Sequence, residues 1–202
     1  MTRSFVPGLA PGAGRRAAPL FAAALLSLLV APLVGVALAL LGWAVLAFYR
    51  DPERATPEGG VLAPADGVIS VVREERDRVR IGVYMSVLNV HVNRAPVGGE
   101  VQQVDHHDGG NLPAFSKDSD RNERVTIDLG ETEVTLIAGA VARRISPYVA
   151  AGDEVARGDR IGHIAFGSRA DVLLPPSIGL DDLYVAEGDR TLAGETILAP
   201  LP

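Results

Sequence analysis

Residues 17–49 form one uncharged stretch of 33 residues in which Ala, Leu and Val predominate. The chain from Arg50 onward is different, because charged residues and Gly are spread throughout it. One straight helix of 33 residues would be about 50 Å long, whereas the hydrocarbon core of a bilayer is about 30 Å thick. We therefore expect a membrane-associating segment at residues 1–50 that is broken or tilted, followed by a separate domain at residues 51–202.

Pro32 and Gly35 lie near the middle of this stretch and predict a break between helical pieces at about 20–31 and 33–49. Arginines flank the stretch on both sides. Positive charge at both ends favours two cytoplasmic ends, and hence a hydrophobic helical hairpin over a single kinked span. Residues 17–49 would then hold the protein at the cytoplasmic face of the cell membrane. A cleaved signal peptide ending at residue 39 is the alternative, but the mature chain would then begin with an apolar segment.

Composition excludes several classes of partner and site. The net charge of -6 and the absence of a basic stripe argue against nucleic acid as a partner. With no cysteine, disulfides, Cys-ligated zinc, iron–sulfur clusters and thiol catalysis are all excluded. The run from Asp105 to Asp108 contains two histidines, but adjacent strand residues point to opposite faces. We expect a strand end there and no metal site.

Short alternating or β-branched runs, bounded by Gly, Pro and Asp, predict strands throughout the second domain. These runs lie at residues 67–73, 79–86, 89–95, 99–107, 123–130, 132–145, 159–168 and 170–175. Three segments, at 59–72, 151–164 and 185–199, share Gly-Asp turns around short apolar pairs. Such turns need Gly at positive φ and Asp as a cap, and they are typical of barrel-sandwich, lipoyl-like hybrid β domains. We therefore expect a mainly β fold of this type.

Three residues of this domain are candidates for chemistry. His91 lies in a strand pattern where it could act as a general base, although an ordinary strand histidine fits equally well. Asp66 precedes Gly67, where a turn-forming aspartate is the ordinary explanation. Ser168 follows Gly167 in the only Gly-Ser pair of the chain. Because glycine leaves the preceding carbonyl open, the Ser168 hydroxyl could attack it, and chain cleavage would leave a pyruvoyl group.

Six motifs place these residues in a common context. In chain order they are FYRDPER, APADGVI, YMSVLNVHVNRAP, NER, IAGAVARRI and FGSRADVLLP. In this order and spacing they resemble the short form of phosphatidylserine decarboxylase, a pyruvoyl-dependent, self-cleaving family with an N-terminal hydrophobic region. The resemblance covers most of the chain.

The resemblance implies conversion of phosphatidylserine to phosphatidylethanolamine and CO₂ through a Schiff base with a pyruvoyl cofactor made from Ser168. Cleavage after Gly167 would give a β chain of residues 1–167 and an α chain of residues 168–202, which form a heterodimer. The lipid substrate resides in the membrane, where residues 17–49 would hold the enzyme.

The longer bacterial members of the family use an aspartate and two histidines in these motifs. Asp66 matches the aspartate and His91 the first histidine, whereas Arg94 stands at the position of the second. The resulting hypothesis is that His91, oriented by Asp66, deprotonates Ser168 during maturation and later protonates the carbanion. Arg94, Arg143 and Arg144 are candidates for binding the lipid phosphate.

A different class of function stays open. A membrane-anchored lipoyl-like module without self-cleavage could serve as a carrier, phosphotransfer or binding domain. A carrier needs a lysine at a hairpin tip, but the only lysine, Lys117, lies in an irregular polar segment. Phosphotransfer could use His91 with His163. The intact mass separates these alternatives from the decarboxylase, because they predict an uncut chain.

Overall fold

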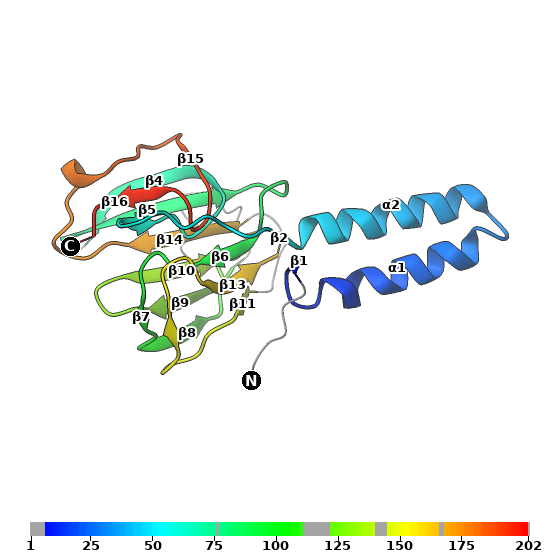
Figure 1. Ribbon diagram of the computed structural model, residues 1–202, viewed down its shortest axis with the longest axis horizontal. Helices are drawn as coiled ribbons and strands as arrows, with labels where there is room; N and C mark the ends of the chain where they lie inside the picture. The colour runs from blue at the N-terminus through cyan, green and yellow to red at the C-terminus, as the bar shows by residue number, and fades with distance from the viewer. Residues whose placement is uncertain (1–6, 76, 111–121, 140–144, 166–167, 202) are drawn as a thin grey trace. The chain divides into compact units, whose positions relative to one another are not determined.

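A computed structural model describes residues 7–75, 77–110, 122–139, 145–165 and 168–201 (Figure 1). The chain divides into two compact units, Met1–Glu53 and Arg54–Pro202, and each is described by itself. The first unit is helical, and the second consists almost entirely of strands. The expectation of a mainly β fold preceded by helices is confirmed.

Two helices make up most of the first unit, α1 (Ala13–Ser27) and α2 (Pro32–Phe48), and the strands β1 (Gly8–Leu9) and β2 (Arg50–Asp51) pair beside them. The ring of Phe21 in α1 contacts that of Trp43 in α2 edge-on, with centroids 5.9 Å apart. Gly42 makes this approach possible, because a Cβ there would lie 2.9 Å from the Phe21 ring.

The break between the helices falls near the predicted position but a few residues earlier. Pro32 is the first residue of α2, where its missing N–H needs no partner and its fixed φ suits the first turn. The first helix starts at Ala13, before the apolar stretch begins, so it includes Arg15 and Arg16. No helix that the structure describes is both long and apolar enough to cross a membrane.

A seven-stranded antiparallel sheet dominates the second unit, in the order β15-β4-β5-β14-β10-β9-β8. Its strands are β4 (Gly67–Glu75), β5 (Arg78–Met85), β8 (Gln103–His107), β9 (Arg124–Asp128), β10 (Glu133–Ile137), β14 (Ser168–Leu173) and β15 (Arg190–Thr191). The sheet is assembled from distant parts of the chain, since β14 lies between β5 and β10. The strands that the structure describes form no closed barrel.

Smaller sheets cover one face of the large sheet (Figure 1). They contain β6 (Val92–Arg94), β11 (Ile145–Pro147) and β13 (Arg160–Ile164), and the pairs β7 (Gly99–Glu100) with β12 (Glu154–Val155) and β3 (Val61–Leu62) with β16 (Ile197–Ala199). A short 3-10 turn, η2 (Leu180–Asp182), precedes β15. Ala170 and Val172 of β14 share one apolar core with Ile161 and Ile164 of β13. The large sheet is therefore apolar on this inner face.

Three Gly-Asp turns follow the predicted pattern. The glycines Gly152, Gly158 and Gly188 have φ of 85°, 87° and 95°. Each following aspartate accepts the N–H of the residue three positions before it at 2.8 Å, which closes the turn. Only a residue without a Cβ adopts this backbone cheaply, and the carboxylate satisfies an N–H that the turn would otherwise leave open.

Several predicted strands have other bounds. The run at 99–107 forms two strands, because Val101 N donates to Asp153 O whereas Gln102 N donates to Asp128 O, so the chain changes partner there. The run at 159–168 ends at Ile164. The sequence predicts a turn at Ser168, but the structure shows Ser168 as the first residue of β14.

Candidate active site

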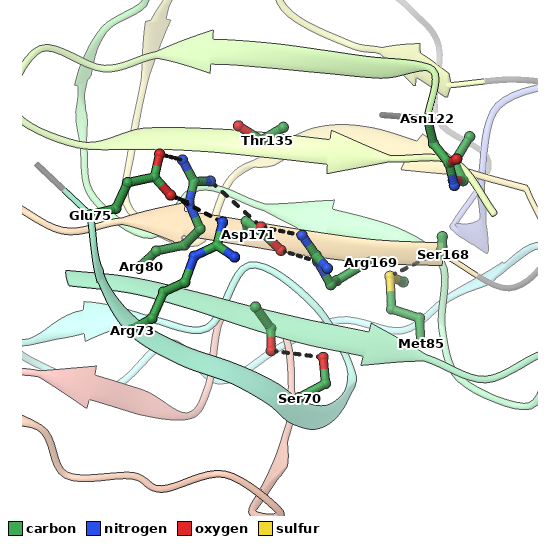
Figure 2. A network of polar contacts seen from close by, with 12 residues as sticks. Ser70, Arg73, Glu75, Arg80, Met85, Asn122, Thr135, Ser168, Arg169 and Asp171 are labelled. Carbon is green, nitrogen blue, oxygen red and sulfur yellow. Dashed lines mark hydrogen bonds and ion pairs between the residues drawn. The ribbon is translucent and has the colours of Figure 1, made fainter. Parts of the chain in front are cut away.

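Ser168 begins a central strand of the large sheet and is fully buried. Its register partner on β5 is Met85, and its Oγ donates a hydrogen bond to Met85 Sδ at 3.4 Å (Figure 2). Because successive strand side chains alternate, Ser168 shares the inner face with Ala170 and Val172. A thioether is a weak acceptor, so the hydroxyl has a neighbour that does not compete strongly for its proton.

The sheet register brings Ser168 and the Asp66 motif to one end of the sheet. Val68 is paired with Tyr84 and Ser168 with Met85, so Gly67, Met85 and Ser168 stand level on three adjacent strands. Strands lie about 4.8 Å apart, which puts the Gly67 and Ser168 backbones about 10 Å from each other. Gly67 has no space for a side chain, because the Tyr84 backbone oxygen occupies that position.

His91 is buried immediately before β6 and is held by two backbone contacts. Its Nδ1 lies 2.9 Å from the Asn89 carbonyl oxygen, and its own carbonyl oxygen accepts the Ile164 N–H at 3.2 Å. A carbonyl only accepts, so Nδ1 carries a proton and the neutral ring has its lone pair on Nε2. Ile164 lies four residues before Ser168, so His91 flanks the segment that leads to the Gly-Ser pair.

Asp66 has different partners from those expected. Arg54 Nη2 donates to both of its carboxylate oxygens, at 2.9 and 2.8 Å, and Ala193 N–H donates to Oδ1 at 2.8 Å. These hydrogen bonds account for a carboxylate that is only 5% exposed. Asp66 therefore neither orients His91, as the relay hypothesis required, nor caps a turn, as the ordinary explanation required. It joins Arg54 of the FYRDPER motif to the turn that follows β15.

Of the three arginines expected to bind the lipid phosphate, the structure describes only Arg94. The Arg94 side chain is buried, and its Nη1 donates to the Gly158 carbonyl at 3.1 Å. That environment favours a structural role for Arg94 over contact with a lipid phosphate. Arg143, Arg144 and Gly167, the expected cleavage-site residue, lie outside the described residues.

The sequence did not point to Asn93 as a site residue. Asn93 is fully buried beside Met85, which contacts Ser168. Its Nδ2 contacts the Pro64 carbonyl at 3.3 Å and Met85 Sδ at 3.7 Å. Its Oδ1 is buried and has no hydrogen-bond partner among the described residues. A buried amide oxygen left in this state is costly, which marks the surroundings of Met85 as a place suited to a further polar group. Alternation with His91 was the only sequence signal for it.

A charged network lies on the opposite face of β14 (Figure 2). Arg169 donates to both oxygens of Asp171, at 2.7 and 2.9 Å, and Arg80 Nη1 lies 3.5 Å from Asp171 Oδ2. Arg80 in turn pairs with Glu75 at 2.7 and 3.0 Å. The Arg80 hydrogen bond lowers the pKa of Glu75. Burial alone would lower the pKa of Arg80, but the contacts with Glu75 and Asp171 raise it.

This network lines a polar cavity of about 430 Å³ on the outer face of the sheet. Arg169 and Asp171 are two residues apart in the sequence and therefore point to the same side of β14. The spacing in SRAD was a signal for the pair, although nothing in it identified Arg80 as the next member. The network joins β14, shortly after Ser168, to the neighbouring strand β5.

The remaining histidines lie on β8 and β13. His106 and His107 are exposed on β8, and His107 is the last residue of that strand. His163 is buried and shares a hydrogen bond of 2.9 Å with the Tyr148 hydroxyl. In the described parts of the chain no group of three or more His, Asp or Glu residues is placed to hold a metal ion.

Comparison with known proteins adds an independent line of evidence. The sequence profile described as "Phosphatidylserine decarboxylase" matches residues 41–199. A putative archaetidylserine decarboxylase proenzyme of Halobacterium salinarum is 58% identical over 167 residues, which cover 82% of this chain and 84% of that protein. A phosphatidylserine decarboxylase proenzyme of Streptomyces avermitilis is 48% identical, and the match covers 93% of this chain and 91% of that protein. One of Thermobifida fusca is 47% identical, and the match covers 97% of this chain and 94% of that protein.

Proposed function

This chain belongs to the phosphatidylserine decarboxylase family, and from that premise we propose that it is a self-cleaving carboxy-lyase acting on the serine headgroup of a membrane phospholipid. The observation that carries the proposal is the placement of Ser168. The only serine that follows a glycine is buried at the start of a central strand, at the sheet end where the Asp66 motif also lies, and His91 contacts Ile164 four residues before it. The relatives' names include both phosphatidylserine and archaetidylserine, which share the serine headgroup. The proposal therefore concerns the headgroup.

Maturation begins when Ser168 Oγ attacks the Gly167 carbonyl carbon. The bond from that carbon to the Ser168 nitrogen breaks, the nitrogen takes a proton, and an ester links the two residues. Loss of the Ser168 Cα proton then expels the Gly167 carboxylate. One water hydrolyses the resulting N-terminal dehydroalanine, releases ammonia and leaves a ketone. The products are the chains 1–167 and 168–202.

His91 is proposed as the base of the first step. With Nδ1–H held by the Asn89 carbonyl, Nε2 is the nitrogen that can take the Oγ proton and return it to the departing amide nitrogen. The Asn89 carbonyl has the orienting role that we had expected of Asp66. Asp66, through Arg54 and Ala193, instead holds the adjoining turn against the end of β4.

The surroundings of Ser168 fit a small carbonyl group in its place. The position is shielded from water, Met85 contacts it, and the Asn93 amide also contacts the Met85 sulfur. A pyruvoyl group there supplies a carbonyl that can bind the substrate amine and accept the electron pair when the carboxylate leaves as CO₂. The chain's own part is to exclude water, to position this group and, through His91, to supply a proton.

The fold supports a lasting pair of chains after cleavage. The segment 168–202 contributes β14 between β5 and β10, β15 beside β4, and β16 beside β3. Its Ala170, Val172 and Leu198 lie in the common core. We expect the two fragments to remain a heterodimer, because separating them would expose this core and break four strand pairings. The three Gly-Asp turns support the lipoyl-like hybrid type for this domain.

The helical unit suits attachment to the cytoplasmic face of the cell membrane. Leu29, Val30 and Leu33 are each between 87% and 88% exposed around the turn between the helices. Exposed apolar groups of this kind favour insertion into a lipid surface. A diacyl lipid leaves a bilayer at a cost of about 0.8 kcal/mol per CH₂ group, so the enzyme has to reach its substrate there.

The intact masses of the purified protein test the proposal. We expect two chains that separate under denaturing conditions and whose masses sum to nearly the 21.2 kDa of the sequence. We also expect release of CO₂ from vesicles that contain phosphatidylserine. A single uncut chain that leaves the lipid unchanged would refute the decarboxylase and favour a β module without self-cleavage.

Substitution of His91 tests the proposed base. His91→Asn can keep the hydrogen bond to the Asn89 carbonyl but removes the basic nitrogen, so we expect cleavage to slow by about 10² to 10⁴-fold. The measurement is the rate at which the two fragments appear, followed by mass spectrometry. His163→Asn, which changes a histidine held by Tyr148, is the matched control. Cleavage and turnover of His91→Asn at wild-type rates would exclude His91 from both steps.

A further inference from the structure

A cavity of about 540 Å³ lies at the same end of the large sheet as Ser168, and the preceding argument does not use it. Ser86 and Asn89 of the turn after β5, Val68 of β4, and Arg190 and Leu192 from β15 onward are among its lining residues. The cavity is thus bounded by three separate segments that the sheet brings together.

Each candidate catalytic residue contacts, or is adjacent in sequence to, a residue that lines this cavity or its immediate neighbour. Ser86 follows Met85, which faces Ser168 across the strand pair. The carbonyl of Asn89 holds the His91 ring. Gly67, which also lines the cavity, follows Asp66. A molecule bound in this cavity would therefore lie beside the reacting centre.

The turn at residues 86–89 presents two apolar side chains beside the cavity. Ser86 N and Oγ both donate to Asn89 Oδ1, at 2.8 and 2.7 Å, and Asn89 N donates to the Ser86 carbonyl at 3.0 Å. These bonds fix the turn, so Val87 and Leu88 at its tip are held outward, 55% and 80% exposed. A rigid tip of this kind keeps apolar surface exposed to water, which is unfavourable.

The apolar surface continues onto the neighbouring segments. Leu192, after β15, is 46% exposed and Val68, on β4, is 37% exposed, and both line the cavity. Two exposed apolar side chains therefore line the cavity, and Val87 and Leu88 lie on the turn whose two ends, Ser86 and Asn89, also line it. Scattered exposed apolar residues are ordinary, but a group around a cavity indicates a binding surface.

One cation stands within this apolar group. Arg190 is paired through its backbone with Val68 and lines the cavity. It is exposed, and its guanidinium forms no hydrogen bond or ion pair with the residues that the structure describes. A guanidinium matches a phosphate diester in charge and can donate two hydrogen bonds to it.

We propose that this cavity binds the headgroup and phosphate of one bilayer phospholipid, with Arg190 on the phosphate and Val87, Leu88 and Leu192 among the acyl chains. The inference rests on the proposed function and adds the site through which the lipid enters. Apolar rim and single cation together match a phospholipid, whose phosphate lies between a polar headgroup and apolar chains. Arg94, the other phosphate candidate that the structure describes, is buried and donates a hydrogen bond to the Gly158 carbonyl.

Two substitutions separate the two halves of this site. The first test compares kcat/KM for phosphatidylserine in phosphatidylcholine vesicles with kcat/KM for water-soluble dibutanoyl phosphatidylserine. We expect Leu88→Ser to lower the ratio of the vesicle value to the soluble value about tenfold, because only the vesicle substrate contacts the apolar tip. Leu180→Ser, an equally simple change at an exposed leucine on η2, is the control and should leave this ratio at the wild-type value.

Arg190→Gln should raise KM at least tenfold for both substrates, since both carry the phosphate and a charge-assisted hydrogen bond contributes about 1.5–3 kcal/mol. Arg190→Lys should restore part of the loss, because it keeps the charge but not the paired donors. Arg73→Gln, an exposed arginine on the other face of the sheet, is the matched control. A fall in kcat at constant KM would contradict phosphate binding by Arg190.

Self-cleavage makes the failures distinguishable, because it needs no lipid. If the wild-type chain neither cleaves nor releases CO₂, the proposed function is wrong. If it does both and Leu88→Ser and Arg190→Gln match their controls on vesicles, only the lipid site is wrong. Variants that fail to cleave would show that these residues serve the fold, which also overturns the assignment.

Discussion

Replacing Ser168 with alanine is expected to leave one uncut chain of 21.2 kDa that releases no CO₂ from any serine phospholipid. The physical reason is that every step of the proposed chemistry begins at one atom. Without Oγ no ester can form at Gly167, the chain has no route to elimination, and no ketone arises at residue 168. The expected loss is complete, whereas loss of His91 should only slow the reaction.

The substitution is a clean test because it should hardly disturb the fold. Among the described residues, Ser168 Oγ donates one hydrogen bond, to the Met85 thioether, and alanine fits the same buried strand position. The melting temperature of Ser168→Ala should therefore remain close to that of the wild-type precursor before cleavage. Ser70→Ala, which removes a serine from β4 whose Oγ contacts the Gly82 carbonyl at 3.4 Å, should cleave as the wild type does. Scission after residue 167 in Ser168→Ala would rule out serine attack.

Asp171→Asn should destabilise the folded chain by about 3–5 kcal/mol. Asp171 is fully buried, and its carboxylate faces Arg169 at 2.7 Å and Arg80 at 3.5 Å. Neutralising it leaves two guanidinium groups close together, one of them only 2% exposed, without their shared counter-charge. The cost arises mostly from the uncompensated charge that stays buried, not from the loss of one contact.

Urea unfolding in the Ser168→Ala background measures this effect on a single covalent chain, for which a two-state analysis is better justified than for a cleaved pair. Asp105→Asn, on β8 at the same cavity, is the matched control and should change the free energy of unfolding by no more than about 0.5 kcal/mol. An equally small effect for Asp171→Asn would mean that the network in Figure 2 contributes little to holding β14.

Local features of the fold were predictable from the sequence. The turns at Asp153, Asp159 and Asp189 could be foreseen because each is closed by a hydrogen bond across three residues and needs one glycine. The break before α2 was predictable because proline is tolerated in the first turn of a helix and not in its interior. The strand changes at Val101 and Ser168 were not, since they depend on which distant strand provides the partner.

The candidate site shows the same division. Ser168, Asp66 and His91 could be selected by residue type and motif order, but their partners could not. Arg54 precedes Asp66 by 12 residues, and Ala193 follows it by 127. The relay from Asp66 to His91 was a plausible pairing of chemical types, and the backbone carbonyl of Asn89 occupies the place that the relay assigned to Asp66.

The sequence by itself determined the family, the order of its motifs, the choice of Ser168 as the proposed reacting residue and the presence of an apolar helical segment before a β domain. The tertiary structure alone decided that Met85 contacts Ser168 from 83 residues away, and that a second face of the same strand holds a buried charge network. It also brought Val68, Arg190 and Leu192 together around one cavity. The reason is that turns and caps form between near neighbours, whereas strand pairing joins residues by a register that no short segment specifies.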